Sequence, residues 1–176
     1  MNTRNNIIET FKHLSEEVGF EQVRISKICA LLHIERKLFY YYFSDKYELL
    51  TTIYLNDINR DFNLAVTDKT NWQSNALKLL SSYRKSEKFY HATVLADNGT
   101  WKRVFGEHME KLFTKLFIEL SAEMTDKIEF YAQFFANGWD GLVFQWIKNY
   151  FSPLETELVD NFNGLINFTQ KYIDNW

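Results

Sequence analysis

The sequence has one cysteine, one proline and six glycines among its 176 residues. The single Cys29 excludes a disulfide framework and a cysteine-ligated zinc site, and it is consistent with a reducing compartment. One proline rules out a proline-rich linker and argues against a turn-dense β-sandwich. No uncharged apolar stretch approaches about 18 residues, and the opening MNTRNNIIETFKHLSEE lacks the apolar core of a secretory signal. We therefore expect a soluble cytoplasmic protein with no membrane partner.

Length and charge narrow the class of protein further. A chain of 176 residues suits one compact domain, or a small module joined to a larger one, and its 46% of hydrophobic residues rules out wholesale disorder. The net charge of −3 does not indicate a nucleic-acid binder, because the first 50 residues carry seven basic and seven acidic side chains. Any affinity for DNA must therefore come from a few well-placed cations.

Aromatic side chains are the abundant class. Of 31 Phe, Tyr and Trp residues, 21 lie after residue 71, including all five tryptophans. This concentration has two interpretations that do not exclude each other. One is a well-filled helical core, and the other is an aromatic-lined cavity for an apolar or planar ligand.

The first 66 residues predict three short helices followed by a longer one. Apolar residues recur with helical spacing over 6–18 and 25–32, and Gly19 follows the first helix at the usual C-cap position. A third short helix over 35–43 starts only three or four residues after the second. Helices joined by so short a connection must cross steeply, which is the helix-turn-helix arrangement. Asp45 and Glu48 then form a capping box that opens a helix over about 45–66.

The remaining residues also predict helices, so the fold class is all-α. After a polar loop at 66–74, the helices are expected at about 73–86, 87–95, 101–123 and 127–151, and a last one from Ser152-Pro153 to about Ile173. The helix over 127–151 is apolar almost all round, and the last helix carries two apolar stripes. A monomer would expose a larger apolar patch than soluble proteins tolerate, so we expect a homodimer with a four-helix interface. The predicted interface residues are Trp146, Tyr150, Val159, Phe162, Ile166 and Ile173.

The segment RISKICALLHIERKLFYYYFSDKYELL, residues 24–50, resembles the helix-turn-helix of the TetR/AcrR family of bacterial transcription regulators. The run Phe39–Phe43 matches the aromatic run that closes the family motif, and Asp45–Glu48 matches the start of its fourth helix. The first helix, with Gly19-Phe20, matches as well. Later in the chain come the pieces Tyr83-Arg84-Lys85, Phe89-Tyr90, Trp101…Phe105 and Gly138…Trp146-Ile147. With these pieces, residues 83–166 resemble the C-terminal domain of regulators akin to the dihydroxyacetone-kinase operon activator. The resemblance implies a helix-turn-helix domain over 1–46, a connecting helix, and a helical regulatory and dimerisation domain over 67–176.

Two residues depart from the family pattern around the turn. His33 stands where the turn usually has glycine, so it must adopt a strained or altered backbone conformation. Glu35 replaces the usual serine N-cap of the recognition helix and is expected to cap poorly. Both departures suggest an individual operator sequence and a modest affinity for it.

Six residues are predicted to contact DNA. In the first turn of the recognition helix, Arg36 and Lys37 are suited to guanine edges, with solvated surface cations as the alternative. The resemblance implies base and phosphate contacts for Tyr40 and Tyr41, for which surface packing is the alternative. It also implies that Lys46 holds a phosphate at the start of the fourth helix, and that Arg24 does so at the second.

The resemblance and the aromatic content together predict a small-molecule effector site in the larger domain. Its expected lining comes from Phe89, Tyr90, Trp101, Phe105, Met109, Phe113, Tyr131, Phe135 and Trp139. We expect no catalytic residue, cofactor or metal, because no motif for them occurs; a site from His91, His108 and nearby carboxylates is the weaker alternative to ordinary histidines. The predicted function is a ligand-responsive dimeric repressor on a near-palindromic operator. The alternatives are a co-activator acting mainly through a protein partner, or an unrecognised all-α enzyme.

Overall fold

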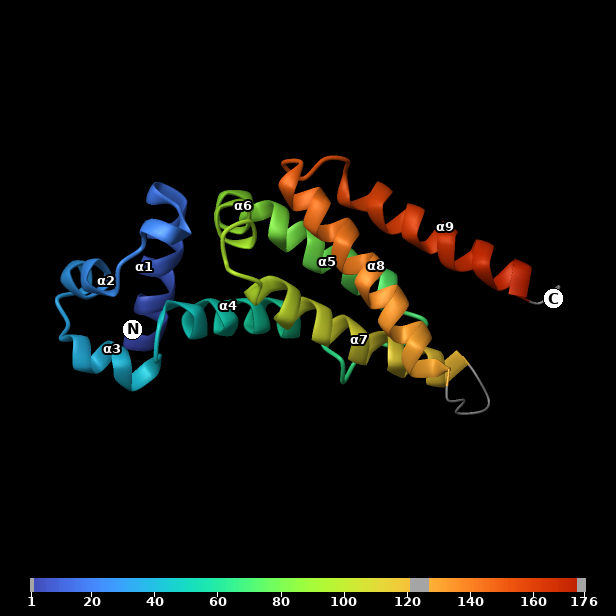
Figure 1. The fold of residues 1–176 in the computed structure, drawn as a ribbon, viewed down its shortest axis with the longest axis horizontal. Helices are drawn as coiled ribbons and strands as arrows, with labels where there is room; N and C mark the ends of the chain where they lie inside the picture. Colours follow the sequence, from blue (N-terminus) through green and yellow to red (C-terminus); the bar gives the residue numbers. More distant parts are fainter. Residues whose placement is uncertain (1, 121–126, 174–176) are drawn as a thin grey trace.

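The computed structural model describes residues 2–120 and 127–173, and these contain helices and no strand (Figure 1). The all-α prediction is therefore confirmed. The elements are α1 (Thr3–Val18), the 3-10 turn η1 (Phe20–Gln22), α2 (Ile25–Leu32), α3 (Arg36–Tyr42), α4 (Lys46–Asp61), α5 (Trp72–Lys85), α6 (Glu87–Val94), α7 (Thr100–Leu120), α8 (Ile128–Lys148) and α9 (Glu155–Ile173).

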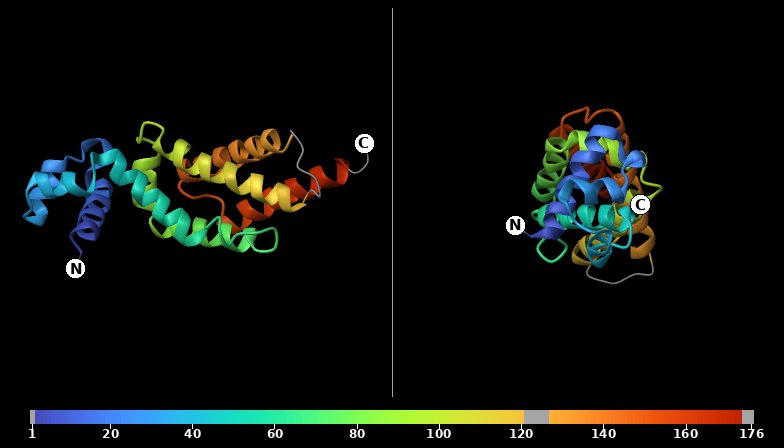
Figure 2. Two further views of the ribbon diagram at one scale, coloured as in Figure 1. Left: turned by 90° about the horizontal axis from the view of Figure 1, so that it is seen from below. Right: turned by 90° about the vertical axis from the view of Figure 1, so that its left-hand side faces the viewer.

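The molecule is elongated, with α1–α3 at one end and α5–α9 filling the other (Figures 1 and 2). Helix α4 runs from the first group into the second and packs against α5 and α7. A second connection is made by α1, which packs against α6. The buried side chains form one continuous core through both groups. The position of α1–α3 relative to the larger helical part is therefore set by the contacts of α4 with α5 and α7 and by the contact of α1 with α6.

The turn between α2 and α3 has the altered backbone that the sequence predicts. His33 ends α2 in the left-handed region, with φ 52° and ψ 42°. Its N–H donates to the carbonyl oxygen of Ala30, and the N–H of Ile34 donates to that of Cys29. Phe39 and Phe43 anchor α3 in the small core, where Cys29 is also buried. Burial raises the pKa of the Cys29 thiol.

Helix α4 begins as predicted and ends earlier. The Asp45 side chain accepts hydrogen bonds from the N–H groups of Tyr47 and Glu48, at 2.7 and 2.8 Å. Glu48 reaches back to the N–H of Ser44, at 2.6 Å. The helix ends at Asp61 instead of about residue 66. Beyond it the Asn63 side chain binds a backbone N–H two residues on, a local turn that competes with helix.

The start of the last helix differs from the prediction. Helix α9 begins at Glu155, so Ser152 is not its N-cap. The connection from α8 turns back through Tyr150 and Phe151, both with positive φ. Arg84 of α5 holds this connection by donating to the carbonyl oxygens of Phe151 and Pro153 and to the carboxylate of Glu155. Long-range contacts therefore override the local capping signal.

His108 of α7 supplies a pH-dependent part of the stability. It is buried, and its Nε2 lies 2.9 Å from the carbonyl oxygen of Phe62 at the end of α4. Burial lowers the pKa of this imidazole below its ordinary value of 6.5. Between the two pKa values the unfolded chain binds a proton that the folded chain does not, so stability is lost as pH falls below about 6.5.

We expect the urea midpoint of the protein to decrease between pH 7.5 and 5.5, and the decrease to be smaller for His108→Gln. The glutamine amide can still donate to the Phe62 carbonyl but does not titrate. His13→Gln, at an exposed position of α1, is the control and should keep the full decrease. Equal pH dependence of all three proteins would show that His108 does not contribute.

Candidate nucleic-acid interface and ligand pocket

The outward face of α3 carries the predicted DNA-reading side chains. Tyr41 and Tyr40 are 79% and 53% exposed, whereas Phe39 between α3 and the core is fully buried. Arg36 and Lys37 are exposed in the first turn of α3, and neither forms a hydrogen bond or ion pair with another described residue. Their cationic groups are therefore available to an external anion or base edge.

The edges of this face contain a poorly capping residue and two exposed residues that were not predicted to contact DNA. Glu35, the N-cap of α3, makes no side-chain capping hydrogen bond, which confirms that it caps poorly. Arg24 is exposed at the N-cap of α2, and exposed Lys27 follows it one turn later on the same face. Lys27 was not among the residues predicted to contact DNA, although its three-residue spacing from Arg24 indicates a shared helix face. Leu38 of α3 was also missed, although it is exposed and apolar beside the tyrosines.

The structure corrects the predicted role of Lys46. Its Nζ donates to the carbonyl oxygens of Phe20 and Glu21, at 3.0 and 3.2 Å. The same ammonium lies 4.4 Å from the ring centroid of Phe20. Burial lowers the pKa of Lys46, and the charge of Arg24 lowers it further. Lys46 thus fastens the start of α4 to η1, and its ammonium is engaged inside the chain instead of facing a phosphate.

Lys46→Ala is expected to lower the free energy of unfolding by about 1–2 kcal/mol, because two carbonyl groups lose a charged donor. The salt dependence of DNA binding should stay unchanged. Lys27→Ala is the matched comparison and should leave urea unfolding unchanged. If Lys27 contacts a phosphate, the dependence of log DNA affinity on log salt concentration should become shallower by about one unit. A shallower salt slope for Lys46→Ala, with unchanged stability, would restore the phosphate role.

Most of the residues predicted to line a ligand cavity instead fill the core. Seven of the nine are buried: Phe89, Tyr90, Trp101, Phe105, Met109, Phe113 and Trp139. Trp101 stacks on Phe105 with ring centroids 4.6 Å apart and meets Tyr54, Tyr83 and Tyr90 edge-on. Phe135 is half-buried, and Tyr131 is exposed. The solid-core interpretation therefore holds for this region.

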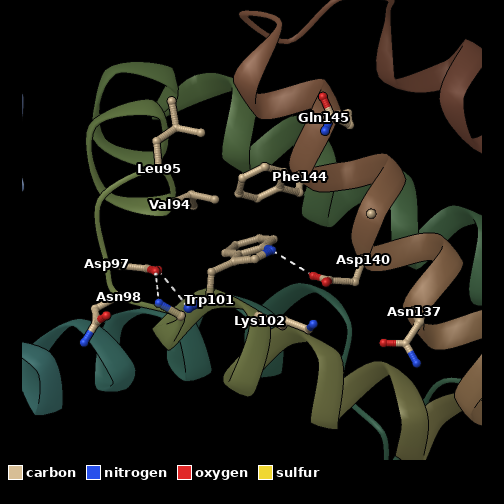
Figure 3. Close-up of a pocket in the computed structure, with 12 residues that line it drawn as sticks. Val94, Leu95, Asp97, Asn98, Trp101, Lys102, Asn137, Asp140, Phe144 and Gln145 are labelled. Carbon is tan, nitrogen blue, oxygen red and sulfur yellow. Dashed lines mark hydrogen bonds between the residues drawn. The ribbon is translucent and has the colours of Figure 1, made fainter.

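A pocket of about 630 Å³ lies at the edge of this core, between the α6–α7 connection and α8 (Figure 3). Of the predicted lining residues, only Trp101 reaches it. Its indole N–H donates to Oδ1 of Asp140, at 3.0 Å. Asp140 is 8% exposed, and burial raises the pKa of its carboxyl group. The remaining lining is Val94, Leu95, Asp97, Asn98, Gly99, Lys102, Asn137, Gly141, Phe144 and Gln145.

Asp97 joins the pocket to α4. Its Oδ2 accepts the backbone N–H of Trp101 at 2.8 Å and lies 3.1 Å from the hydroxyl of Tyr54. Its Oδ1 accepts the N–H of Gly99 at 3.0 Å. Burial raises the pKa of this carboxyl group, and these donors oppose the shift. One carboxylate therefore holds both the start of α7 and the middle of α4.

Further contacts fix α4 against α6 and α1. The Tyr90 hydroxyl donates to Oδ2 of Asp57 at 2.6 Å, and Arg60 binds Oδ1 at 2.7 Å. Lys12 of α1 lies 4.0 Å from the same carboxylate. The pocket wall and the DNA-reading end are thus linked through side chains of α4.

Three of the six predicted dimer contacts require a correction. Trp146, Val159 and Phe162 are buried within the chain itself, since α8 and α9 pack on α5–α7. Trp146 donates to the carbonyl oxygen of Pro153, at 2.8 Å. Tyr150 is exposed and stacks on His91, with ring centroids 4.2 Å apart. Ile166 is half-buried, and the side chain of Ile173 lies outside the described residues.

A different stripe of α8 is exposed and apolar. Phe130 and Phe134 are 66% and 65% exposed, and Leu142 is also exposed. Gly138 continues the stripe, and no neighbouring atom lies where its Cβ would be. The small Gly138 beside these large side chains leaves room for a second helix to pack closely.

Two kinds of site receive no support from the described residues. Within residues 2–120 and 127–173, no three His, Cys, Asp or Glu side chains are grouped as metal ligands. None of the helices described there has the length and apolar character of a membrane span.

Comparison with known families follows the same division of the chain. Residues 7–53 match the family described as "Bacterial regulatory proteins, tetR family". Residues 70–168, more than half of the chain, match "Transcriptional regulator C-terminal region". The helix-turn-helix and the larger helical part together define a regulator of transcription. The chain belongs to the TetR family.

Individual relatives are distant. The chain is 29% identical over 117 residues to the HTH-type dhaKLM operon transcriptional activator DhaS of Lactococcus lactis subsp. lactis (strain IL1403). That alignment covers 66% of this chain but only 62% of the relative. The solved structure of the dihydroxyacetone kinase operon activator DhaS superposes with a TM-score of 0.72 at 23% identity, covering 99% of this chain and 97% of the other. Thermus thermophilus FadR, a TetR-family repressor in complex with lauroyl-CoA, gives 0.62 at 12% identity, with 92% of each chain covered. These structural likenesses show the fold alone.

Proposed function

We propose that this protein is a homodimeric regulator that binds a near-palindromic DNA operator through α3 and responds to a small molecule in its larger domain. Residues 1–46 would form the DNA-binding domain and 67–176 the regulatory domain. The observation that carries the proposal is the exposed face of α3, where Arg36 and Lys37 have no partner among the described residues and Tyr40 and Tyr41 project outward. The descriptions of the matched relatives favour a regulator over an enzyme.

Dimerisation is supported by the exposed stripe of α8. Phe130, Phe134 and Leu142 form an apolar surface that a single chain leaves in water. Pairing this stripe with its symmetry copy would bury it, and α9 would complete a four-helix interface. The two copies of α3 would then meet successive major grooves, about 34–36 Å apart.

Phe134→Glu is expected to shift the dimer towards monomer, because a carboxylate without a partner would enter an apolar interface. Sedimentation velocity at micromolar concentration measures the shift. Gln133→Glu adds the same charge one residue earlier, on a neighbouring face, and should remain dimeric. A dimer of unchanged strength in both variants would move the interface away from this stripe.

The effector response is supported by the contacts between the pocket and α4. Asp97 lies in the pocket wall and within hydrogen-bond distance of Tyr54, so a ligand that shifts the α6–α7 connection would also shift α4. Such a shift would change the separation of the two DNA-reading ends. We propose that the protein represses transcription, as predicted in the sequence analysis. The matched relatives include both an activator and a repressor.

The proposal is tested by fluorescence anisotropy with duplexes that tile the DNA upstream of the protein's own reading frame. One duplex should bind at least about 1,000-fold more tightly than scrambled DNA of the same composition, with two chains per duplex. Equal affinity for all duplexes would overturn the proposed operator recognition. It would favour a co-activator that acts through a protein partner.

A further inference from the structure

The pocket between the α6–α7 connection and α8 has a polar end and an apolar end. Lys102 and Asn137 lie on the same side of the Trp101 indole as Asp140 (Figure 3). Val94, Leu95 and Phe144 lie on the opposite side, with Gln145 beyond Phe144 (Figure 3). A volume of about 630 Å³ falls within the usual range for small-molecule sites.

Two opposite charges at the polar end have no ion-pair partner among the residues that the structure describes. Asp140 accepts the Trp101 indole N–H with Oδ1, and no described residue donates to its Oδ2. The carboxylate is nine-tenths buried, so water compensates it poorly. Lys102 extends from α7 near it and makes no hydrogen bond or ion pair with a described residue. The two groups are too far apart for an ion pair, although the Lys102 charge favours the ionised form of Asp140.

The apolar end offers a surface for a hydrocarbon side chain. Phe144 is half-buried and Leu95 exposed, so a ligand would cover both. Gly141 of α8 faces this space with no atom near the position of a Cβ. A larger side chain at residue 141 would therefore enter the pocket without displacing neighbouring residues.

We propose that the pocket binds a zwitterionic α-amino acid with an apolar side chain, as the effector of the proposed function on which this inference rests. The ligand ammonium donates to Asp140, the ligand carboxylate accepts from Lys102, and the side chain lies against Val94, Leu95 and Phe144. A ligand with only an ammonium is repelled by Lys102, and one with only a carboxylate is repelled by Asp140. The zwitterion matches both charges and enters without a net charge.

Three ligands that differ by one charged group test this assignment. L-Phenylalanine, phenethylamine and 3-phenylpropanoic acid are titrated into the full chain by isothermal calorimetry without DNA. L-Phenylalanine should bind about tenfold or more tightly than either of the others, since each lacks one charge-assisted contact. Equal binding of phenethylamine would overturn the role of Lys102 and indicate a site for cations. Equal binding of 3-phenylpropanoic acid would overturn the role of Asp140, and no binding of any of the three ligands would overturn the proposal.

Variants assign the binding to this pocket. Asp140→Asn can keep the hydrogen bond from Trp101 through its amide oxygen, while it removes the charge. It should reduce the preference for L-phenylalanine over 3-phenylpropanoic acid by about tenfold. Gly141→Leu should abolish binding by filling the cavity, whereas Glu129→Leu, exposed on the same helix outside the pocket, should not. Circular dichroism confirms that each variant is folded. Wild-type binding by Gly141→Leu would place the ligand elsewhere and contradict the proposal.

The operator experiment separates this inference from the proposed function. Binding of L-phenylalanine without any change in operator affinity keeps the amino-acid site and overturns its effector role. Operator binding without any response to the ligand series, together with no heat of binding, overturns the amino-acid site and leaves DNA recognition intact.

Discussion

Arg36→Ala is expected to weaken operator binding by about 10- to 100-fold, corresponding to about 1–3 kcal/mol. The guanidinium lies in the first turn of α3, exposed and with no hydrogen-bonding partner among the described residues. It can therefore donate two parallel hydrogen bonds to a guanine edge without first breaking contacts inside the protein. Anisotropy titrations of the operator, and of variants changed one base pair at a time, should show relaxed preference at one position in each half-site.

Lys148→Ala provides the control for this experiment. Lys148 is exposed at the end of α8, so its removal changes the net charge by the same amount far from α3 (Figure 1). Its operator affinity should stay within about twofold of the unmodified protein at physiological salt, because distant exposed charges are screened. Unchanged affinity and specificity of Arg36→Ala would remove this residue from the interface.

Arg84→Ala is expected to lower the free energy of unfolding by about 2–4 kcal/mol. The Arg84 side chain binds Glu155 at 2.5 Å and the carbonyl oxygens of Phe151 and Pro153 at 2.5 and 2.9 Å. Its guanidinium also lies 5.4 Å from the ring centroid of Trp146. Truncation would remove the side-chain donor of the Phe151 carbonyl. It would also leave the Pro153 carbonyl with Trp146 alone and the Glu155 carboxylate with Ser81 alone.

The adjacent Lys85→Ala is the matched control, because Lys85 is exposed and also ends α5. Its unfolding free energy should change by less than about 0.5 kcal/mol. The free energies of unfolding of the unmodified protein, Arg84→Ala and Lys85→Ala are compared by urea unfolding at equal protein concentration. A loss below 1 kcal/mol for Arg84→Ala would mean that water replaces these contacts at little cost.

The DNA-reading end could be predicted well because its signals are local. The short connection between the second and third helices, the aromatic run and the Asp45–Glu48 capping box all lie within 25 residues. The structure confirms the capping contacts and the left-handed His33. Lys46 was misassigned because its carbonyl partners, Phe20 and Glu21, lie 26 and 25 residues away in sequence. The local spacing of residues in the sequence does not predict a contact over such a separation.

The larger domain shows where sequence reasoning reaches its limit. Aromatic abundance predicts burial but does not say which rings face a cavity, and only Trp101 of the nine predicted residues reaches the pocket. The same ambiguity led to Trp146, Val159 and Phe162 as dimer contacts, since an all-round apolar helix does not reveal which face its own domain covers. Asp140 was not predicted as a site residue, because its role depends on an indole 39 residues earlier in the sequence.

The shared carboxylate of Asp97 has a consequence for attempts to build biosensors from this protein. Because it caps α7 and lies within hydrogen-bond distance of Tyr54, any replacement that reshapes residues 95–99 also alters the resting position of α4. Selection for a new ligand in that segment would therefore change background transcription as well as response. Libraries restricted to Lys102, Phe144 and Gln145, which line the pocket without touching this network, would allow the dynamic range and the ligand preference to be tuned separately.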